Sequence, residues 1–413
     1  MIADFEAKLR EYAHLIVEVG LNLQSGQTPT INAPVACAPL ARLCVEAAYD
    51  RGARQVICDW SDDFITRETF LRADEAVFSE YPSYLKAKLD WMLERECPRL
   101  SFTGYNPELL KGVDMARVKA QRLASTEPTK AYFDAMTASR FQWCVAAYAT
   151  PEWAMKVFPD KSEEDAVDAL WEAIFKTCRV EADGKTVERW HAHIDAMTRR
   201  AKLLNDYDFK SLHYTNAAGT DLTVELPENH IWGGGAELSG SGILFAPNLP
   251  TEEIFTAPRW DGVNGHVVSS LPLSLDGHLV KGFSMDFENG KIVRVHADEG
   301  EEVLKNAISL DEGAAYLGEV ALVPYDSPIR NTGLTFSNTL FDENASCHLA
   351  FGAAYPTCVK DGDKMGDEER KQAGLNNSMT HVDFMIGTSD LSIAGVTRDG
   401  REIPVFVDGG FAF

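Results

Sequence analysis

The chain has 413 residues, a hydrophobic fraction of 45%, a charged fraction of 25% and a formal net charge of −24 at pH 7. This length exceeds what one ordinary hydrophobic core organises, so we expect two domains, residues 1–205 and 206–413. The acidic balance argues against nucleic acid and anionic membrane surfaces as partners, because both bind basic protein surfaces. We also expect no membrane-spanning segment, since no apolar run approaches the ~20 residues that such a helix needs.

Cysteine usage and the N-terminal segment predict the compartment. The eight cysteines are dispersed and form no C-x-x-C pair, which is typical of reduced, structural cysteine. Residues 1–10 predict an amphipathic helix and lack the basic start and apolar centre of a secretory signal. We therefore expect a cytoplasmic protein.

The first half alternates helix and strand signals. Strands are predicted at 55–60, 99–103 and 142–148, and helices at 40–49, 85–96, 115–123 and 162–177. Strands that alternate with helices of ten or more residues indicate a parallel α/β sheet. Neither a G-x-G-x-x-G nor a G-x-x-x-x-G-K-[ST] motif is present in this half. We therefore interpret residues 1–205 as a scaffold and substrate-gating domain.

The second half, entered through a helix predicted at 187–204, is rich in short strands. These are predicted at 220–226, 265–270, 291–296, 319–323 and 402–408, with a helix at 300–309. Glycine-rich turns separate the strands. The polar segment 360–372 is expected to form a mobile loop. The sequence thus predicts a β-rich α+β domain for residues 206–413.

One strand of this half pairs a histidine with a carboxylate. His381 and Asp383 are two residues apart in the strand-like run MTHVDFMI (379–386). Side chains two apart on a strand point to the same face, so both can reach one divalent metal ion. The alternative is an edge strand whose polar face is exposed to solvent.

Further candidate ligands lie at the ends of predicted elements, where functional residues concentrate. They are Glu252, Glu253, Glu319, Glu343, His348 and Tyr355. Each has a purely structural alternative, such as a solvated strand end for Glu253 or a core histidine bonded to backbone for His348. Leaving Glu252 aside, these residues together with His381 and Asp383 supply four carboxylates and two imidazoles, which suit two metal ions that share a bridging carboxylate.

Four strings of this half occur in an order that resembles a known family. They are NLPTEEIFT (248–256), GEVALV (318–323), NTLFDENASCH (338–348) followed by Tyr355, and THVDFMIG (380–387). They resemble the thermophilic-type metallo-aminopeptidases, a family that includes aminopeptidase T, aminopeptidase S and the PepS-like enzymes. The resemblance extends to the length and two-part layout of nearly the whole chain, although its specific motifs are confined to the second half.

The resemblance implies a metal-dependent aminopeptidase that hydrolyses the N-terminal peptide bond of peptides through water activated by two metal ions. It implies that Tyr355 is the catalytic hydroxyl and that the metal ligands are Glu253, Glu319, Glu343, His348, His381 and Asp383. We expect Glu319 to bridge the ions, and Glu319 or Glu252 to act as the general base. Zinc is the expected metal, with cobalt, manganese or magnesium as alternatives. The substrate would be a peptide with a free N-terminus and the assembly a homodimer.

Two other functions fit parts of the pattern. A two-metal hydrolase of a phosphoester or an acylated amine would use the same ligand types, but a phosphoesterase is expected to bring Arg or Lys to its site, and the four strings contain neither. A non-catalytic acidic protein that binds calcium or a peptide would have no need for two histidines, because calcium prefers oxygen ligands.

Overall fold

The computed structural model describes residues 2–275 and 278–413 and divides the chain into two units. The first consists of Met1–His193 with Ala236–Pro250, and the second of Ile194–Gly235 with Thr251–Phe413. The boundary expected after residue 205 lies inside helix α8 (Thr186–Tyr207). The gating role assigned to the first half stays a prediction.

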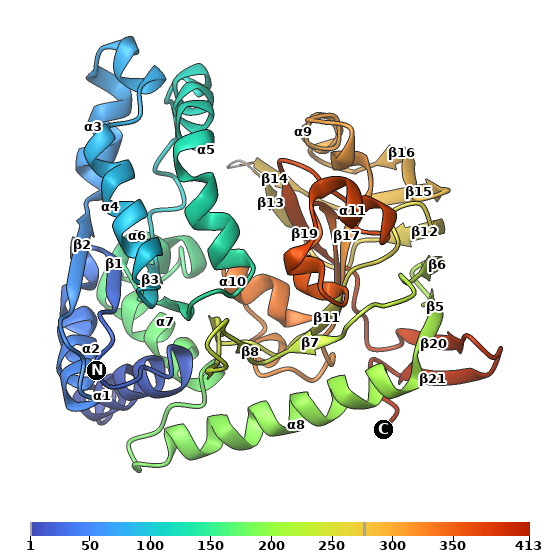
Figure 1. Cartoon of the computed structure of the whole chain (residues 1–413), viewed down its shortest axis with the longest axis horizontal. Coiled ribbons are helices and arrows are strands. Elements are labelled where there is room, and N and C mark those ends of the chain that lie inside the picture. Colours follow the sequence, from blue (N-terminus) through green and yellow to red (C-terminus); the bar gives the residue numbers. More distant parts are fainter. Residues whose placement is uncertain (1, 276–277) are drawn as a thin grey trace. The chain divides into compact units, whose positions relative to one another are not determined.

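The first unit is built on a parallel five-stranded sheet in the order β10-β4-β3-β1-β2 (Figure 1). Its strands are β1 (Thr30–Pro34), β2 (Ile57–Ser61), β3 (Arg99–Thr103), β4 (Trp143–Ala147) and β10 (Asn248–Leu249). Helix α1 (Phe5–Leu15) precedes the first strand, and the helices that follow it are α2 (Ala38–Asp50), α3 (Asp63–Arg72), α4 (Ser83–Glu94), α5 (Met115–Thr137), α6 (Pro151–Val157) and α7 (Glu163–Thr177). The predicted α/β class of this half is confirmed.

Helix ends in this unit follow local chemistry. Helix α7 begins as predicted, because the Ser162 hydroxyl accepts a hydrogen bond from the Asp165 amide at its first turn. Helix α5 was expected to end near residue 123 but continues through Pro128 to Thr137. Helix α3 was not predicted, since Phe70 is its one buried residue and the apolar periodicity is accordingly weak.

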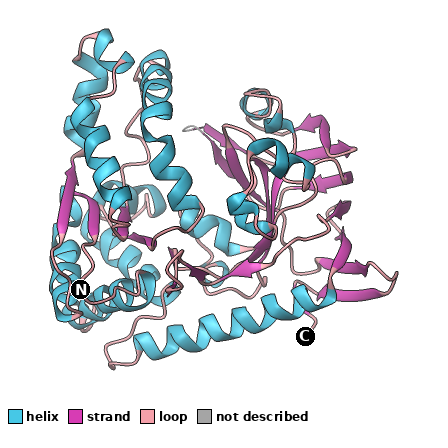
Figure 2. Ribbon diagram, in the orientation of Figure 1, coloured by secondary structure: helices cyan, strands magenta, loops and turns pink. Residues whose placement is uncertain are grey.

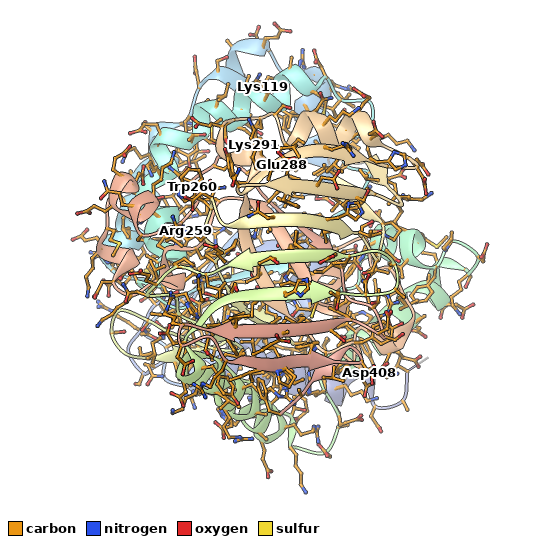
Figure 3. All side chains as sticks on the ribbon, turned by 90° about the vertical axis from the view of Figure 1, so that its right-hand side faces the viewer. Lys119, Arg259, Trp260, Glu288, Lys291 and Asp408 are labelled. Atoms are coloured by element: carbon orange, nitrogen blue, oxygen red, sulfur yellow. The ribbon has the colours of Figure 1, made fainter. Side chains whose placement is uncertain are left out.

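The second unit contains an antiparallel eight-stranded sheet in the order β16-β15-β12-β6-β5-β20-β21-β22. Its strands are β5 (Phe209–Thr215), β6 (Asp221–Glu225), β12 (Val263–Val268), β15 (Ser284–Glu288), β16 (Lys291–His296), β20 (Ser392–Thr397), β21 (Glu402–Val407) and β22 (Gly410–Phe411). Figure 3 shows these strands side by side, with Glu288 and Lys291 near one edge and Asp408 near the other. Figure 2 shows how strands dominate this unit, which confirms the predicted β-rich α+β class.

A second sheet, five-stranded, runs in the order β19-β18-β17-β11-β7. It consists of β7 (Gly233–Gly234), β11 (Ile254–Thr256), β17 (Leu317–Leu322), β18 (His348–Gly352) and β19 (His381–Met385). One face of it packs on the eight-stranded sheet through a shared apolar core that includes Val320, Leu349 and Phe384. Every residue of β17 and β18 is buried, so the opposite face of these strands is covered as well.

The segment 360–372 is not the simple loop that its polar composition suggested. It forms a 3-10 turn at Gly362–Lys364 and the short helix α11 (Asp367–Gln372). The Glu369 carboxylate accepts a hydrogen bond from the Gly366 amide and caps this helix. Other short helices of the unit are α9 (Glu301–Ala307) and α10 (Thr339–Asp342). Among the described residues, no helix combines the length and the apolarity needed to cross a membrane.

Candidate metal centre

The predicted site residues gather on the face of the five-stranded sheet that points away from the shared core. In the strand register, Ala350 of β18 lies opposite Glu319 of β17 on one side and Asp383 of β19 on the other. His381 is two residues from Asp383, and His348 two residues from Ala350. Since alternate residues of a strand share a face, the four polar side chains point to the same side.

Glu253 reaches the same place from the segment before β11. Phe255 pairs with Ala321, which in turn pairs with His348. Glu253 precedes Phe255 by two residues, and it is 8% exposed. The sequence-distant strings containing residues 253, 319, 348 and 381–383 are therefore neighbours because their strands are neighbours.

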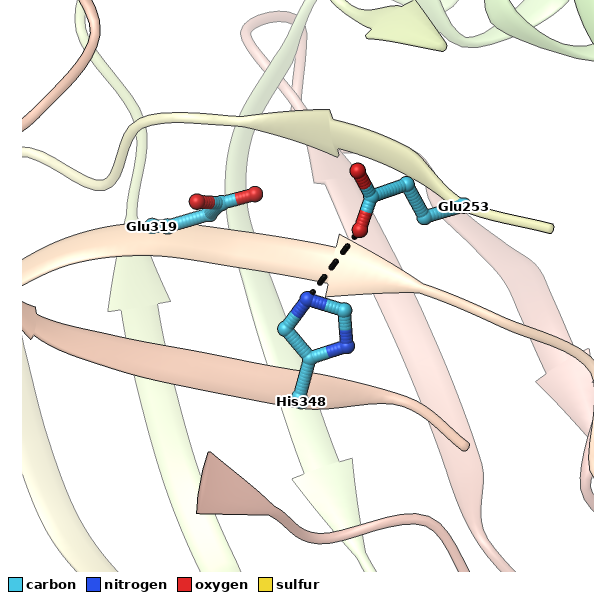
Figure 4. Close-up of side chains that lie close together, drawn as sticks. All are labelled: Glu253, Glu319 and His348. Atoms are coloured by element: carbon cyan, nitrogen blue, oxygen red, sulfur yellow. Dashed lines mark ion pairs between the residues drawn. The ribbon is translucent and has the colours of Figure 1, made fainter. Parts of the chain in front are cut away.

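One group of potential ligand atoms comes from Glu253, Glu319 and His348. One ligand atom from each lies within 4.8 Å of the others. The His348 Nε2 atom is 3.2 Å from Glu253 Oε2 (Figure 4). All three side chains are buried, and His348 is 1% exposed.

A second group comes from Glu319, His381 and Asp383, again with ligand atoms within 4.8 Å of one another. The His381 Nε2 atom lies 3.0 Å from Glu319 Oε2 and 3.2 Å from Asp383 Oδ1. Glu319 belongs to both groups. Its carboxylate thus occupies the position that a ligand shared by two neighbouring ions would need.

Both histidines are oriented by backbone carbonyls. His381 Nδ1 lies 2.7 Å from the Ala353 oxygen, and His348 Nδ1 lies 3.2 Å from the Ser346 oxygen. A carbonyl can only accept, so each Nδ1 carries a proton and donates it. In the neutral imidazole, Nε2 then carries a lone pair that faces carboxylate oxygens. A proton or a metal ion must therefore lie between Nε2 and these oxygens. This orientation is typical of metal-binding histidine.

The pKa values of the two histidines are shifted by burial and by the carboxylates around them. Burial by itself lowers the pKa of His348, but the hydrogen bond and charge of Glu253, with Asp383 and Glu319 nearby, raise it to about 10. Burial likewise opposes protonation of His381, whose pKa is nevertheless raised by Asp383 and Glu319. The site attracts positive charge, as a cation-binding site must.

The pKa values of the carboxylates are likewise shifted in opposite directions by burial and by neighbouring groups. Burial raises the pKa of Glu319, the bond from His381 lowers it, and the charges of Glu253 and Asp383 raise it again. For Asp383, burial raises the pKa, but the two imidazoles outweigh it and the net shift is downward. Buried carboxylates of like charge are costly unless cations compensate them.

Glu343 lies at the border of this cluster, at the start of the 3-10 turn Glu343–Ala345. Burial, followed by the charges of Asp383 and Glu253, raises the pKa of its carboxyl well above the usual range. The two groups of ligand atoms found among the described residues do not include it. Glu343 and Asp383 instead line a cavity of about 90 Å³ together with Leu273 and Met385.

Tyr355 follows β18 and lies beside the second group. Its ring centroid is 5.4 Å from that of His381 and 6.0 Å from that of Phe255. The ring is half-buried. The structure therefore brings the ring of Tyr355 next to a predicted ligand.

The donor set fits divalent metal ions. Imidazole nitrogen and carboxylate oxygen are the ligands that zinc takes in catalytic sites. The four carboxylates of Glu253, Glu319, Glu343 and Asp383 would balance the charge of two divalent ions if both imidazoles are neutral. Asn344 also contacts this region, since its side chain is hydrogen-bonded to the Glu252 amide and to Glu343 Oε1; sequence reasoning missed it, and the one available signal was its place directly after Glu343.

Comparisons with known proteins cover the chain from end to end. The family model described as thermophilic metalloprotease (M29) matches residues 5–411. Aminopeptidase PepS of Streptococcus thermophilus is 46% identical over 410 residues, which are 99% of each chain. Aminopeptidase 2 of Geobacillus stearothermophilus is 44% identical over 409 residues, 99% of this chain and 98% of that protein. The solved structure of wild-type AmpT from Thermus thermophilus matches with a TM-score of 0.92 at 39% identity, covering 99% of this chain and 100% of the other.

Proposed function

We propose that this chain, which belongs to the thermophilic metalloproteases (M29) and is a metal-dependent aminopeptidase, binds two divalent ions that share the carboxylate of Glu319. The observation that carries the proposal is that Glu319 contributes to both groups of ligand atoms. Similarity to aminopeptidases along the whole chain decides against a phosphoesterase and against a non-catalytic binding protein.

In this proposal each ion has its own ligands besides Glu319. Glu253 and His348 hold one ion, and His381 and Asp383 hold the other. Glu343 is the sixth candidate ligand, supported by its place beside the same charged groups and in the cavity that Asp383 lines. We propose zinc as the native metal because the set combines imidazole with carboxylate, and cobalt, manganese or magnesium as alternatives.

When bound, two neighbouring divalent ions supply Lewis acidity and make water a stronger acid. The chain's own groups do the rest. Tyr355 donates a hydrogen bond to the oxygen on which negative charge develops during peptide hydrolysis. Glu319 or Glu252 accepts the proton of the attacking water.

We further propose that the enzyme acts as a homodimer in the cytoplasm. The dimer rests on the family resemblance, and size-exclusion chromatography with light scattering tests it. The location is supported by the cysteines, all eight of which are present as thiols and seven of which are buried.

Paired substrates test the proposed site. Leucine p-nitroanilide should be hydrolysed, N-acetyl-leucine p-nitroanilide should not, and a chelator should abolish the reaction until zinc, cobalt or manganese is returned. Recovery of activity should require two equivalents of metal per chain. Full recovery with one equivalent would overturn the two-metal proposal while leaving the aminopeptidase intact.

A further inference from the structure

Residues 251–253, which carry the proposed ligand Glu253, are buried but belong to no strand. They precede β11, and all three are 8% exposed or less. A buried stretch outside a sheet cannot satisfy its amide groups through strand pairing, and an unpaired buried amide is costly. The chain must therefore fix this stretch by other contacts.

Asn344 supplies these contacts. Its side chain is fully buried, and its Oδ1 accepts hydrogen bonds from the Glu252 amide at 2.8 Å and from the Thr251 hydroxyl at 3.3 Å. The Thr251 hydroxyl oxygen in turn lies 3.5 Å from the Glu253 amide nitrogen. One amide oxygen thus holds the backbone on which Glu253 is mounted.

The amide nitrogen of the same side chain contacts a second segment, residues 340–343, which carries Glu343. Asn344 Nδ2 donates to the Leu340 carbonyl at 3.2 Å and to Glu343 Oε1 at 3.4 Å. Leu340 belongs to α10, so this end is fixed to a helix. Asn344 therefore links the segment carrying Glu253 to the turn carrying Glu343, and it uses both oxygen and nitrogen to do so.

We propose that Asn344 is a positioning residue that sets the orientation of Glu253 and thereby the affinity of the ion held by Glu253 and His348. The inference rests on the proposed two-metal site. Groups that orient metal ligands typically contribute about 10- to 100-fold to metal affinity. Asn344→Ala should therefore weaken the binding step of that ion by about tenfold or more and weaken the other step less.

The test is a cobalt titration of the metal-free full-length chain, followed by visible absorption and by competition with a chelator. The wild type should show two binding steps, and Glu253→Gln identifies the step that belongs to Glu253. Asn344→Ala should weaken that same step and alter its absorption band. Asn264→Ala is the matched control, because the exposed Asn264 side chain also accepts a hydrogen bond from a backbone amide, that of Asn289, between β15 and β16 of the eight-stranded sheet.

Thr251→Val keeps the test independent of folding. It removes one hydroxyl at constant shape and should weaken the same binding step less than Asn344→Ala does. The effects of the two substitutions on this affinity should not add in the double mutant, because both act on one segment. Should Asn344→Ala fail to fold, Thr251→Val decides alone. Unchanged affinities in the folded variants would overturn the role of Asn344. A single binding step in the wild type would instead overturn the two-metal proposal.

Discussion

His381 Nε2 lies 3.0 Å from a carboxylate oxygen of Glu319, although strand β18 separates the strands on which the two residues stand. The contact is possible because the facing positions of β18 are small: His381 lies opposite Gly352, which has no side chain, and Glu319 lies opposite Ala350, which offers a single methyl group. The site is therefore built across β18, over a residue too small to fill the space above it.

Enlarging this residue should close that space. Ala350→Val places two extra methyl groups between Glu319 and Asp383, and extra volume in a packed site typically costs about 1–3 kcal/mol of stability. We expect a folded chain that binds less metal and loses activity in proportion, measured by elemental analysis and circular dichroism. Native metal content in this variant would show that the space above Ala350 is not where the ions bind.

The neighbouring residue provides the opposite prediction. Leu349 is fully buried and faces the shared core, away from the site. Leu349→Ala should lower the free energy of unfolding by about 2–5 kcal/mol, since it leaves a cavity. Denaturant unfolding measures this loss, while metal per folded chain should stay at the wild-type value. A selective loss of metal here would contradict the division of the sheet into a core face and a site face.

Removing an imidazole should remove a ligand. His381→Ala should lower the metal content of the purified chain, because Nε2 faces both Glu319 and Asp383. His213→Ala is a matched control, since His213 pairs with Asp221 on the exposed side of the eight-stranded sheet. Atomic absorption that finds full metal in His381→Ala would remove this residue from the ligand set.

Tyr355→Phe separates catalysis from metal binding. The variant keeps the ring that packs beside His381 but lacks the hydroxyl. Losing one donor to a developing oxyanion typically costs about 2.7–4 kcal/mol in the barrier, roughly 100- to 1,000-fold in kcat. Metal content should not change. Tyr316→Phe, which removes a hydroxyl from a ring packed on Trp260, serves as the control. Near-normal turnover of Tyr355→Phe would exclude the hydroxyl from the reaction.

Part of this site was accessible from the sequence. The two-residue spacing of His381 and Asp383 predicts that both side chains lie on one face of the strand. The structure shows this arrangement, with 3.2 Å between His381 Nε2 and Asp383 Oδ1. The remaining residues required the order β19-β18-β17-β11, which arises from long-range strand pairing that local patterns do not encode. The resemblance of the four sequence strings to the family indicated these remaining residues, which hydrophobic periodicity alone does not identify.

Other features escaped prediction for physical reasons. Helix α11 is polar on all sides and has no buried residue, so composition suggested a loop. Asn344 accepts hydrogen bonds from the Glu252 amide and the Thr251 hydroxyl, and no pattern in the sequence reveals that its side chain reaches this segment. The role of Ala350 is likewise visible only once Glu319 and Asp383 are known to flank it.

The central claim is that two ions share Glu319, and anomalous diffraction from a crystal of the zinc-loaded chain tests it most directly. Two zinc peaks are predicted, one within about 2.0–2.2 Å of ligand atoms of Glu253, Glu319 and His348, and one equally close to Glu319, His381 and Asp383. A single peak, or two peaks of which only one contacts Glu319, would contradict the account.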